Sequence, residues 1–123
     1  MKLSNAEEQL MEIVWKCETA FLKDIIGYYP DPKPASTTIV TLLKRMQQKG
    51  ALAYRLFGNS RQYYPLIHKE DYFKGCIGEI VKNFFGNSAL QFASFFTTAG
   101  NLSEKELEEL KKLVDKELNR IKK

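Results

Sequence analysis

Hydroxyl and cationic side chains share one side of the stretch STTIVTLLKRMQQKG, residues 36–50. An apolar stripe recurs there at helical spacing and consists of Ile39, Leu42, Leu43 and Met46. The side chains off this stripe include Thr37, Thr41, Lys44 and Arg45, with no acid among them. Hydroxyls bond to phosphates and base edges, the threonine methyl can contact thymine, and cations neutralise phosphates. The pattern predicts a helix with one core face and one nucleic-acid face; the alternative is an ordinary solvated helix.

The charge distribution supports the first interpretation. Acidic residues are absent from Pro32 to Lys69, although they are frequent elsewhere in the chain. The cations of this acid-free stretch are Lys33, Lys44, Arg45, Lys49, Arg55, Arg61 and Lys69. The formal net charge of the 123 residues is only +4, so net charge alone argues weakly for a nucleic-acid partner. The local absence of carboxylates is the stronger signal.

Local signals predict three short helices followed by a β-hairpin. Ser4 and Glu7 form a capping-box pattern at the start of the first helix, which reaches residue 17. The second helix is expected over residues 19–29, ended by PDPKP, and the third over 36–49, ended by Gly50. An alternating strand follows from residue 52, then a turn at Gly58 and Asn59, then a returning strand QYYPL.

This order of elements is typical of a winged-helix domain, which we expect over residues 1–70. In such domains the third helix lies in the DNA major groove and the hairpin reaches along the backbone. Winged-helix folds also serve as protein–protein adapters, which is the competing function. The candidate DNA-binding residues are Ser36, Thr37, Thr38, Thr41, Lys44, Arg45, Arg55, Asn59, Ser60 and Arg61.

Residues 71–123 are expected to form a helical dimerisation region, with helices over 69–85, 89–100 and 102–123. An isolated amphipathic helix is marginal in water, so a second copy of the chain would have to cover the apolar faces. The alternative is that this region folds back on its own winged-helix domain. The candidate dimerisation residues are Ile77, Ile80, Val81, Phe84, Phe85, Phe92, Phe95, Phe96, Leu107, Leu110, Val114, Leu118 and Ile121.

Three segments together resemble the penicillinase-repressor family: SNAEEQLMEIVWK, TTIVTLLKRMQQKGAL and YRLFGNSRQYYPLIHKEDY. These are bacterial winged-helix repressors that include the methicillin-resistance regulators and the copper-responsive repressors. The resemblance implies a homodimer that binds double-stranded DNA at an inverted-repeat operator and blocks transcription. It maps the recognition motif onto Thr37, Thr38, Thr41 and Lys44, and the wing onto residues 58–63.

Two departures from the family pattern bear on the operator sequence rather than on DNA binding. Many relatives carry Trp-Ser-Pro-Lys before the recognition helix, where this chain has Pro34, Ala35, Ser36 and Thr37. The wing often contains Gly-Arg, where this chain has Gly58 and Asn59.

The resemblance also implies a possible route of inactivation in the antibiotic response. In β-lactam-responsive members, a membrane-bound sensor system leads to cleavage in the C-terminal part, and the dimer falls apart. The matching segment contains Ser94, Phe95 and Phe96, with the vulnerable bond expected before Phe95 or Phe96. The alternative is that these phenylalanines form the dimer core.

Other chemistry has little support in the residues. His68 is the sole histidine, and no catalytic triad motif or glycine-rich phosphate loop is present, so we expect no enzyme and no cofactor. Cys17 and Cys76 are far apart and form no CxxC pair, which argues against a metal site or a disulfide framework. The N-terminus has no apolar signal region, and no run suits membrane insertion, so we expect a cytoplasmic protein.

Overall fold

The first helix, α1 (Asn5–Cys17), begins at the predicted capping box. The Ser4 hydroxyl accepts a hydrogen bond from the Glu7 N–H at 3.2 Å, and the Glu7 carboxylate accepts one from the Ser4 N–H at 2.8 Å. These bonds satisfy backbone donors that the first helical turn leaves free. This computed structural model describes residues 1–122 of the chain. Lys123, which ends the helix expected over 102–123, lies outside the described residues.

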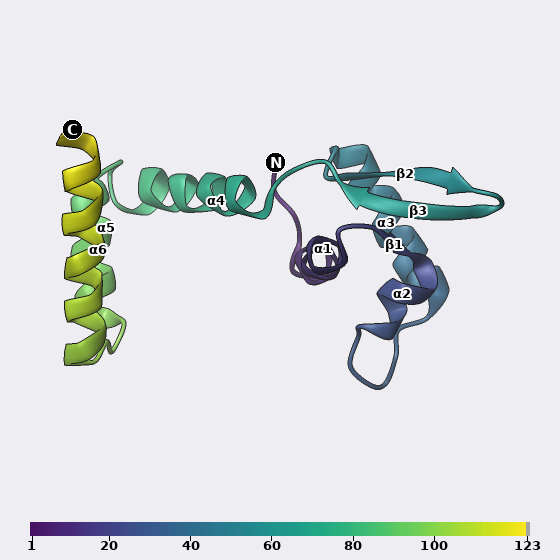
Figure 1. The fold of residues 1–123 in the computed structure, drawn as a ribbon, viewed down its shortest axis with the longest axis horizontal. Coiled ribbons are helices and arrows are strands. Elements are labelled where there is room, and N and C mark those ends of the chain that lie inside the picture. Colours follow the sequence, from purple (N-terminus) through teal and green to yellow (C-terminus); the bar gives the residue numbers. More distant parts are fainter. Residues whose placement is uncertain (123) are drawn as a thin grey trace. The chain divides into compact units, whose positions relative to one another are not determined.

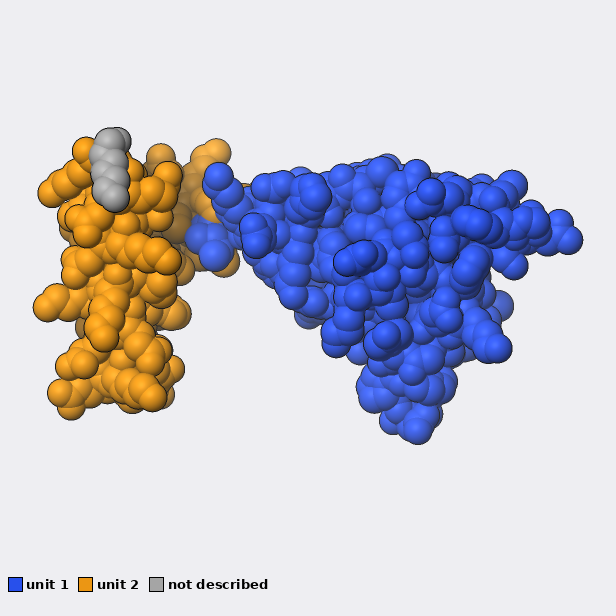
Figure 2. Space-filling model, viewed as in Figure 1, with its two compact units in different colours: residues 1–77 blue, residues 78–123 orange. Residues whose placement is uncertain are grey.

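The elements fall into two compact units, residues 1–77 and 78–123, which Figure 2 distinguishes by colour. We call them unit 1 and unit 2. Unit 1 contains α1, β1 (Ala20–Phe21), α2 (Leu22–Gly27), α3 (Ser36–Lys49), β2 (Leu52–Phe57), β3 (Ser60–Pro65) and the first part of α4 (Lys69–Phe84) (Figure 1). The predicted order of three helices and a hairpin is confirmed, and the chain is mainly helical with a small sheet.

The core of unit 1 lies where the three helices meet the sheet. The predicted stripe of α3 supplies buried Ile39, Leu43 and Met46, with Leu42 half-buried beside them. The other helices and β2 add fully buried side chains, among them Leu10, Val14, Ile25 and Leu52. Each such side chain stabilises the fold by roughly 1.5–3 kcal/mol relative to exposure. Burial of this stripe fixes the opposite face of α3 toward the exterior.

A short strand, β1, was not predicted; the expected second helix began at residue 19. Instead Ala20 pairs with Tyr63 and Phe21 with Gln62, which makes an antiparallel sheet of order β1-β3-β2. Helix α2 then begins at Leu22, and the Asp24 carboxylate accepts a hydrogen bond from the Phe21 N–H at 3.1 Å. This pairing holds the start of α2 beside β3.

The hairpin of β2 and β3 turns at Gly58 and Asn59, as predicted. Phe57 pairs with Ser60 across the turn, and the register runs back to Leu52 opposite Pro65. Gly58 adopts φ of 60°, a backbone conformation that glycine reaches without steric cost. Gly50 likewise ends α3 in the left-handed conformation.

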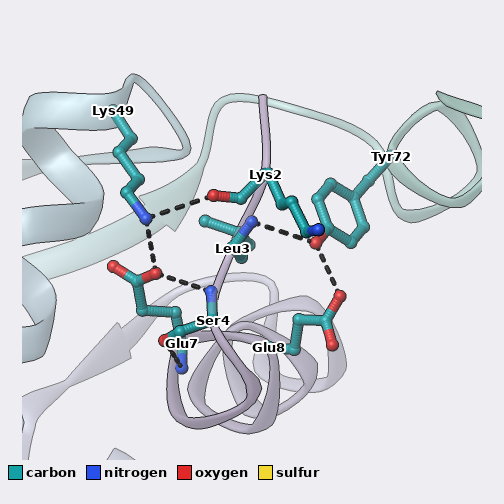
Figure 3. A network of polar contacts seen from close by, with 7 residues as sticks. All are labelled: Lys2, Leu3, Ser4, Glu7, Glu8, Lys49 and Tyr72. Atoms are coloured by element: carbon teal, nitrogen blue, oxygen red, sulfur yellow. Dashed lines mark hydrogen bonds and ion pairs between the residues drawn. The ribbon is translucent and has the colours of Figure 1, made fainter. Parts of the chain in front are cut away.

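The C-terminal end of α3 is tied to α1 by an ion pair between the exposed side chain of Lys49 and the buried carboxylate of Glu7 (Figure 3). The Lys49 ammonium donates to the Glu7 carboxylate at 2.6 Å and to the Lys2 carbonyl at 3.1 Å. Burial alone would raise the pKa of Glu7, but the Lys49 ammonium and the Ser4 donors outweigh it, so the pKa is lowered. Lys49 is therefore a structural residue of the acid-free stretch.

We expect Glu7→Gln to lower the free energy of unfolding by about 1–3 kcal/mol at pH 7, since it leaves the Lys49 contact without its charge. Because the pKa of Glu7 is lowered on folding, its contribution is present above the ordinary value of 4.5 and lost as the pH falls through the folded value. Urea titrations should therefore separate wild type from Glu7→Gln at pH 7, and the difference should shrink as the pH is lowered below 4.5. The matched control is Glu12→Gln, which breaks the half-exposed pair with Lys69 and should cost at most about 1 kcal/mol. Equal effects of the two variants would contradict this account.

The start of α4 is anchored on α1 within unit 1. The Tyr72 hydroxyl donates to the Glu8 carboxylate at 2.6 Å and accepts from the Leu3 N–H at 3.2 Å (Figure 3). Burial and this carboxylate raise the pKa of Tyr72. The Trp15 indole donates to the Ile67 carbonyl at 2.9 Å, and its ring lies 6.0 Å from that of Tyr72. The first turns of α4 are thus part of unit 1.

Unit 2 contains the end of α4, then α5 (Ala89–Ala99) and α6 (Glu104–Lys122). The second predicted capping box is present, with Ser103 and Glu106 bonded reciprocally at 3.1 Å. Phenylalanines join α4 and α5: the ring of Phe85 lies 5.5 Å from Phe92 and 5.6 Å from Phe95. Among its described residues no side chain is fully buried, so unit 2 exposes a large apolar surface in the single chain.

Candidate nucleic-acid interface

The outer face of α3 carries every predicted side chain of the recognition motif. These residues are all exposed: Ser36, Thr37, Thr38, Thr41, Lys44 and Arg45. The Thr41 hydroxyl donates to the Thr37 carbonyl at 2.9 Å. Since its proton is engaged, the hydroxyl oxygen of this exposed residue remains available as an acceptor. Thr41 can therefore accept from a base amino group or contact a thymine methyl.

The N-terminus of α3 adds backbone donors to this face. Ala35 caps the helix without a side-chain hydrogen bond, and the first turn contains no acidic residue. The first N–H groups of a helix lack intrahelical partners and carry partial positive charge. A phosphate is the natural ligand for such a terminus when a cationic face continues from it.

Two arginines flank the tip of the hairpin, but they lie on opposite faces of the sheet. The register pairs Arg55 with Gln62 and Leu56 with Arg61, and side chains alternate between faces along a strand. Arg61 lies 4.4 Å over the ring of Tyr54, and Arg55 lies 5.2 Å over that of Tyr64. Of the two arginines, Arg61 lines the cleft between α3 and the hairpin, together with Asn59 and Ser60, and Arg55 does not.

We expect Arg61→Ala to weaken duplex DNA binding by about fivefold at 0.15 M salt, the contribution of one phosphate contact. Arg55→Ala, on the opposite face, should change affinity less than twofold. Fluorescence anisotropy with a labelled duplex compares the two variants directly. A larger loss for Arg55→Ala would show that the hairpin meets DNA with its other face.

The structure divides the cations of the acid-free stretch into two groups. Lys49 binds Glu7, Lys69 binds Glu12 at 3.0 Å, and Lys33 donates to the carbonyls of Gly27 and Tyr29. The second group makes no ion pair within residues 1–122 and consists of Lys44, Arg45, Arg55 and Arg61. Within the acid-free stretch, the positive charge that the described residues engage neither in ion pairs nor in hydrogen bonds to backbone carbonyls therefore lies on α3 and the hairpin.

The predicted dimerisation residues lie on α4, α5 and α6, except Phe85, which directly follows α4; Ile77 is at the end of unit 1. Val81, Phe85, Phe92 and Leu110 are half-buried within the single chain. The exposed members are Ile77, Ile80, Phe84, Phe95, Phe96, Leu107, Val114, Leu118 and Ile121. Ser94 is exposed and lies with Phe95 and Phe96 inside α5.

The remaining chemistry of the described residues is limited. Within residues 1–122 no group of three or more His, Cys, Asp or Glu side chains is placed to hold a metal ion. Cys17 and Cys76 are free and half-buried, and His68 is exposed. In the part of the chain that the structure describes, no helix has the length and apolar character to span a membrane.

Comparison with solved structures defines the class of the fold. The chain resembles the structure titled as the solution structure of the DNA-binding domain of the repressor BlaI, with a TM-score of 0.51 and 30% identity. The match covers 58% of this chain and 88% of that one. The fold is therefore that of a winged-helix DNA-binding repressor domain, as the order of elements predicted.

Sequence comparison over nearly the whole chain identifies the family. The family model described as penicillinase repressor matches residues 3–116. The chain is 27% identical over 122 residues to the penicillinase repressor of Bacillus licheniformis, covering 98% of this chain and 95% of that protein. It is 30% identical over 120 residues to the methicillin resistance regulatory protein MecI of Staphylococcus aureus, covering 94% of each. The chain belongs to the penicillinase repressor family, whose members are DNA-binding transcriptional regulators and not enzymes.

Proposed function

We propose that this chain acts as a cytoplasmic homodimer that represses transcription by binding an inverted-repeat operator. The observation that carries the proposal is the outer face of α3, which is exposed, free of acids and rich in hydroxyls and cations. In this proposal α3 lies in the major groove and the hairpin lies along the adjacent backbone. Base edges are read by Thr37, Thr38 and Thr41, while Lys44 and Arg45 neutralise phosphates.

Residues 1–70 serve as the DNA-binding domain in this proposal, and residues 71–123 serve as the dimerisation region. The exposed apolar side chains of unit 2 support the second role, because Phe84 is 79% exposed and Phe95 is 58% exposed in the single chain. Burying several such side chains at roughly 1.5–3 kcal/mol each offsets the cost of association. The α3 helices of the two protomers, held about 34–36 Å apart, would match the two half-sites of a palindromic operator.

The test combines the oligomeric state with the salt dependence of binding. Analytical ultracentrifugation at micromolar concentration should give a dimer. Anisotropy with a duplex selected from a random library should give an affinity that falls steeply with salt, by about 0.9 in log–log slope for each phosphate contact. A monomer would contradict the dimer, and an affinity independent of salt would contradict DNA binding through this face.

We also propose that induction involves cleavage near Ser94, Phe95 and Phe96 by a membrane-bound sensor protease that responds to β-lactams. The names of the relatives support the antibiotic response, and the exposure of Phe95 supports access. Because the segment lies inside α5, the helix has to unwind locally before a protease can hold it as an extended strand. Mass spectrometry after incubation with the activated sensor would identify the cut, and an intact chain would contradict it.

A further inference from the structure

A cleft of about 610 Å³ lies between α3 and the tip of the hairpin in unit 1. Apolar lining comes from Leu22, Val40 and Tyr63, and polar lining includes Lys23, Asn59 and Arg61. Tyr63 is buried and Leu22 half-buried, whereas the polar residues are exposed. Val40 is exposed as well, so Tyr63 and Leu22 form the deeper part of the cleft and the cations lie at the rim. No acidic residue of the described chain lines this cleft.

The unpredicted strand β1 creates this arrangement. Its pairing with β3 ends at Phe21 opposite Gln62, so β3 continues to Ser60 without a strand on that side. The chain then enters α2, which brings Lys23 to the cleft. The neighbouring acid, Asp24, accepts the Phe21 N–H and lines a separate depression with Lys16 and Cys17. Sequence patterns gave no signal for Lys23, because its position depends on pairing with a distant strand.

We propose that this cleft seats one sugar-phosphate strand of bound duplex DNA, and that Lys23 binds a phosphate of that strand. The inference rests on the proposed function. Val40 belongs to the helix assigned to the major groove, and Asn59 and Arg61 belong to the hairpin assigned to the backbone. A strand at the edge of the groove has to pass between these two elements.

The chemistry of the cleft matches this occupant. Lys23 and Arg61 supply positive charge for phosphates, and Asn59 supplies an amide donor. The apolar groups beside them, with exposed Val40 among them, offer contact to the carbon atoms of deoxyribose. Since these contacts involve only the sugar-phosphate backbone of the DNA, Lys23 contributes affinity without preference for a DNA sequence.

The test measures duplex affinity as a function of salt for Lys23→Gln, Lys23→Arg and the control Lys74→Gln. Lys74 is exposed on the first part of α4, so its loss changes the net charge of unit 1 equally. With a labelled random-sequence duplex, Lys23→Gln should lose about fivefold in affinity at 0.15 M salt and about 0.9 in log–log slope. Lys23→Arg and Lys74→Gln should match wild type.

Each outcome separates this inference from the function on which it rests. Salt-dependent binding by wild type, with Lys23→Gln unchanged, would overturn the cleft assignment and leave the repressor intact. Failure of wild type to bind any duplex would overturn the proposed function itself. Lys23→Gln could instead change the sedimentation coefficient and leave the salt dependence of DNA affinity unchanged. That result would assign the cleft to a protein–protein contact and also overturn the inference.

Discussion

Reversing both charges on the outer face of α3, with Lys44→Glu and Arg45→Glu together, is expected to lower duplex affinity at least about 100-fold at 0.15 M salt. Each phosphate contact contributes about fivefold at this salt, so two lost contacts account for about 25-fold. Repulsion between the new carboxylates and the phosphates increases the loss further. Both side chains are exposed and make no ion pair among residues 1–122, so the fold should be unaffected.

The control for this variant places the same charge change on α6. Lys112→Glu with Lys116→Glu alters the face opposite the apolar stripe of α6, and both residues are exposed. Anisotropy at several salt concentrations should show near wild-type affinity for the control. Thermal melts followed by circular dichroism should be the same for both variants. Comparable affinity losses in the two double variants would show that net charge, not the face of α3, governs binding.

Placing two glutamates on the apolar stripe of α6 is expected to produce a monomer. Val114 is 59% exposed and Leu118 is 46% exposed in the single chain, so Val114→Glu with Leu118→Glu should leave its helices intact. In a dimer interface the two charges would be buried without partners, which is strongly unfavourable. Analytical ultracentrifugation at micromolar concentration measures this change directly.

Loss of the dimer should also reduce operator binding by about 100-fold or more, because linked half-sites gain affinity through effective concentration. The probe is a duplex selected for binding to the wild-type chain. Lys112→Gln with Lys116→Gln gives the same net charge change on the opposite face of α6 and should remain dimeric. A glutamate variant that stays dimeric would place the interface elsewhere in the chain.

Local chemistry made much of unit 1 predictable. The Ser4 and Glu7 capping box, Gly50 at the end of α3, and the turn at Gly58 each act over a few residues, and the structure confirms them. The stripe of α3 likewise follows from helical periodicity, which identified the exposed face before any fold was known.

Long-range pairing accounts for what the sequence did not reveal. A strand of two residues is too short to show alternation, so the sequence predicts helix at β1 and gives no indication that Lys23 lines a cleft. Lys49 looked equivalent to Lys44 until the fold brought it to Glu7, 42 positions away. The opposite faces of Arg55 and Arg61 depend on the register of the hairpin. In unit 2 the helices were predictable from their caps, but the partner for their apolar faces is not encoded in any local pattern.

Photo-cross-linking at Thr41 tests most directly whether the outer face of α3 lies on DNA. Thr41 and, in a separate variant, Lys74 are replaced by a photoreactive phenylalanine analogue, and each protein is irradiated with a duplex selected for binding to the wild-type chain. The account predicts a cross-link to DNA from position 41 and none from position 74. A bound duplex that cross-links from position 74 but not from position 41 would contradict it.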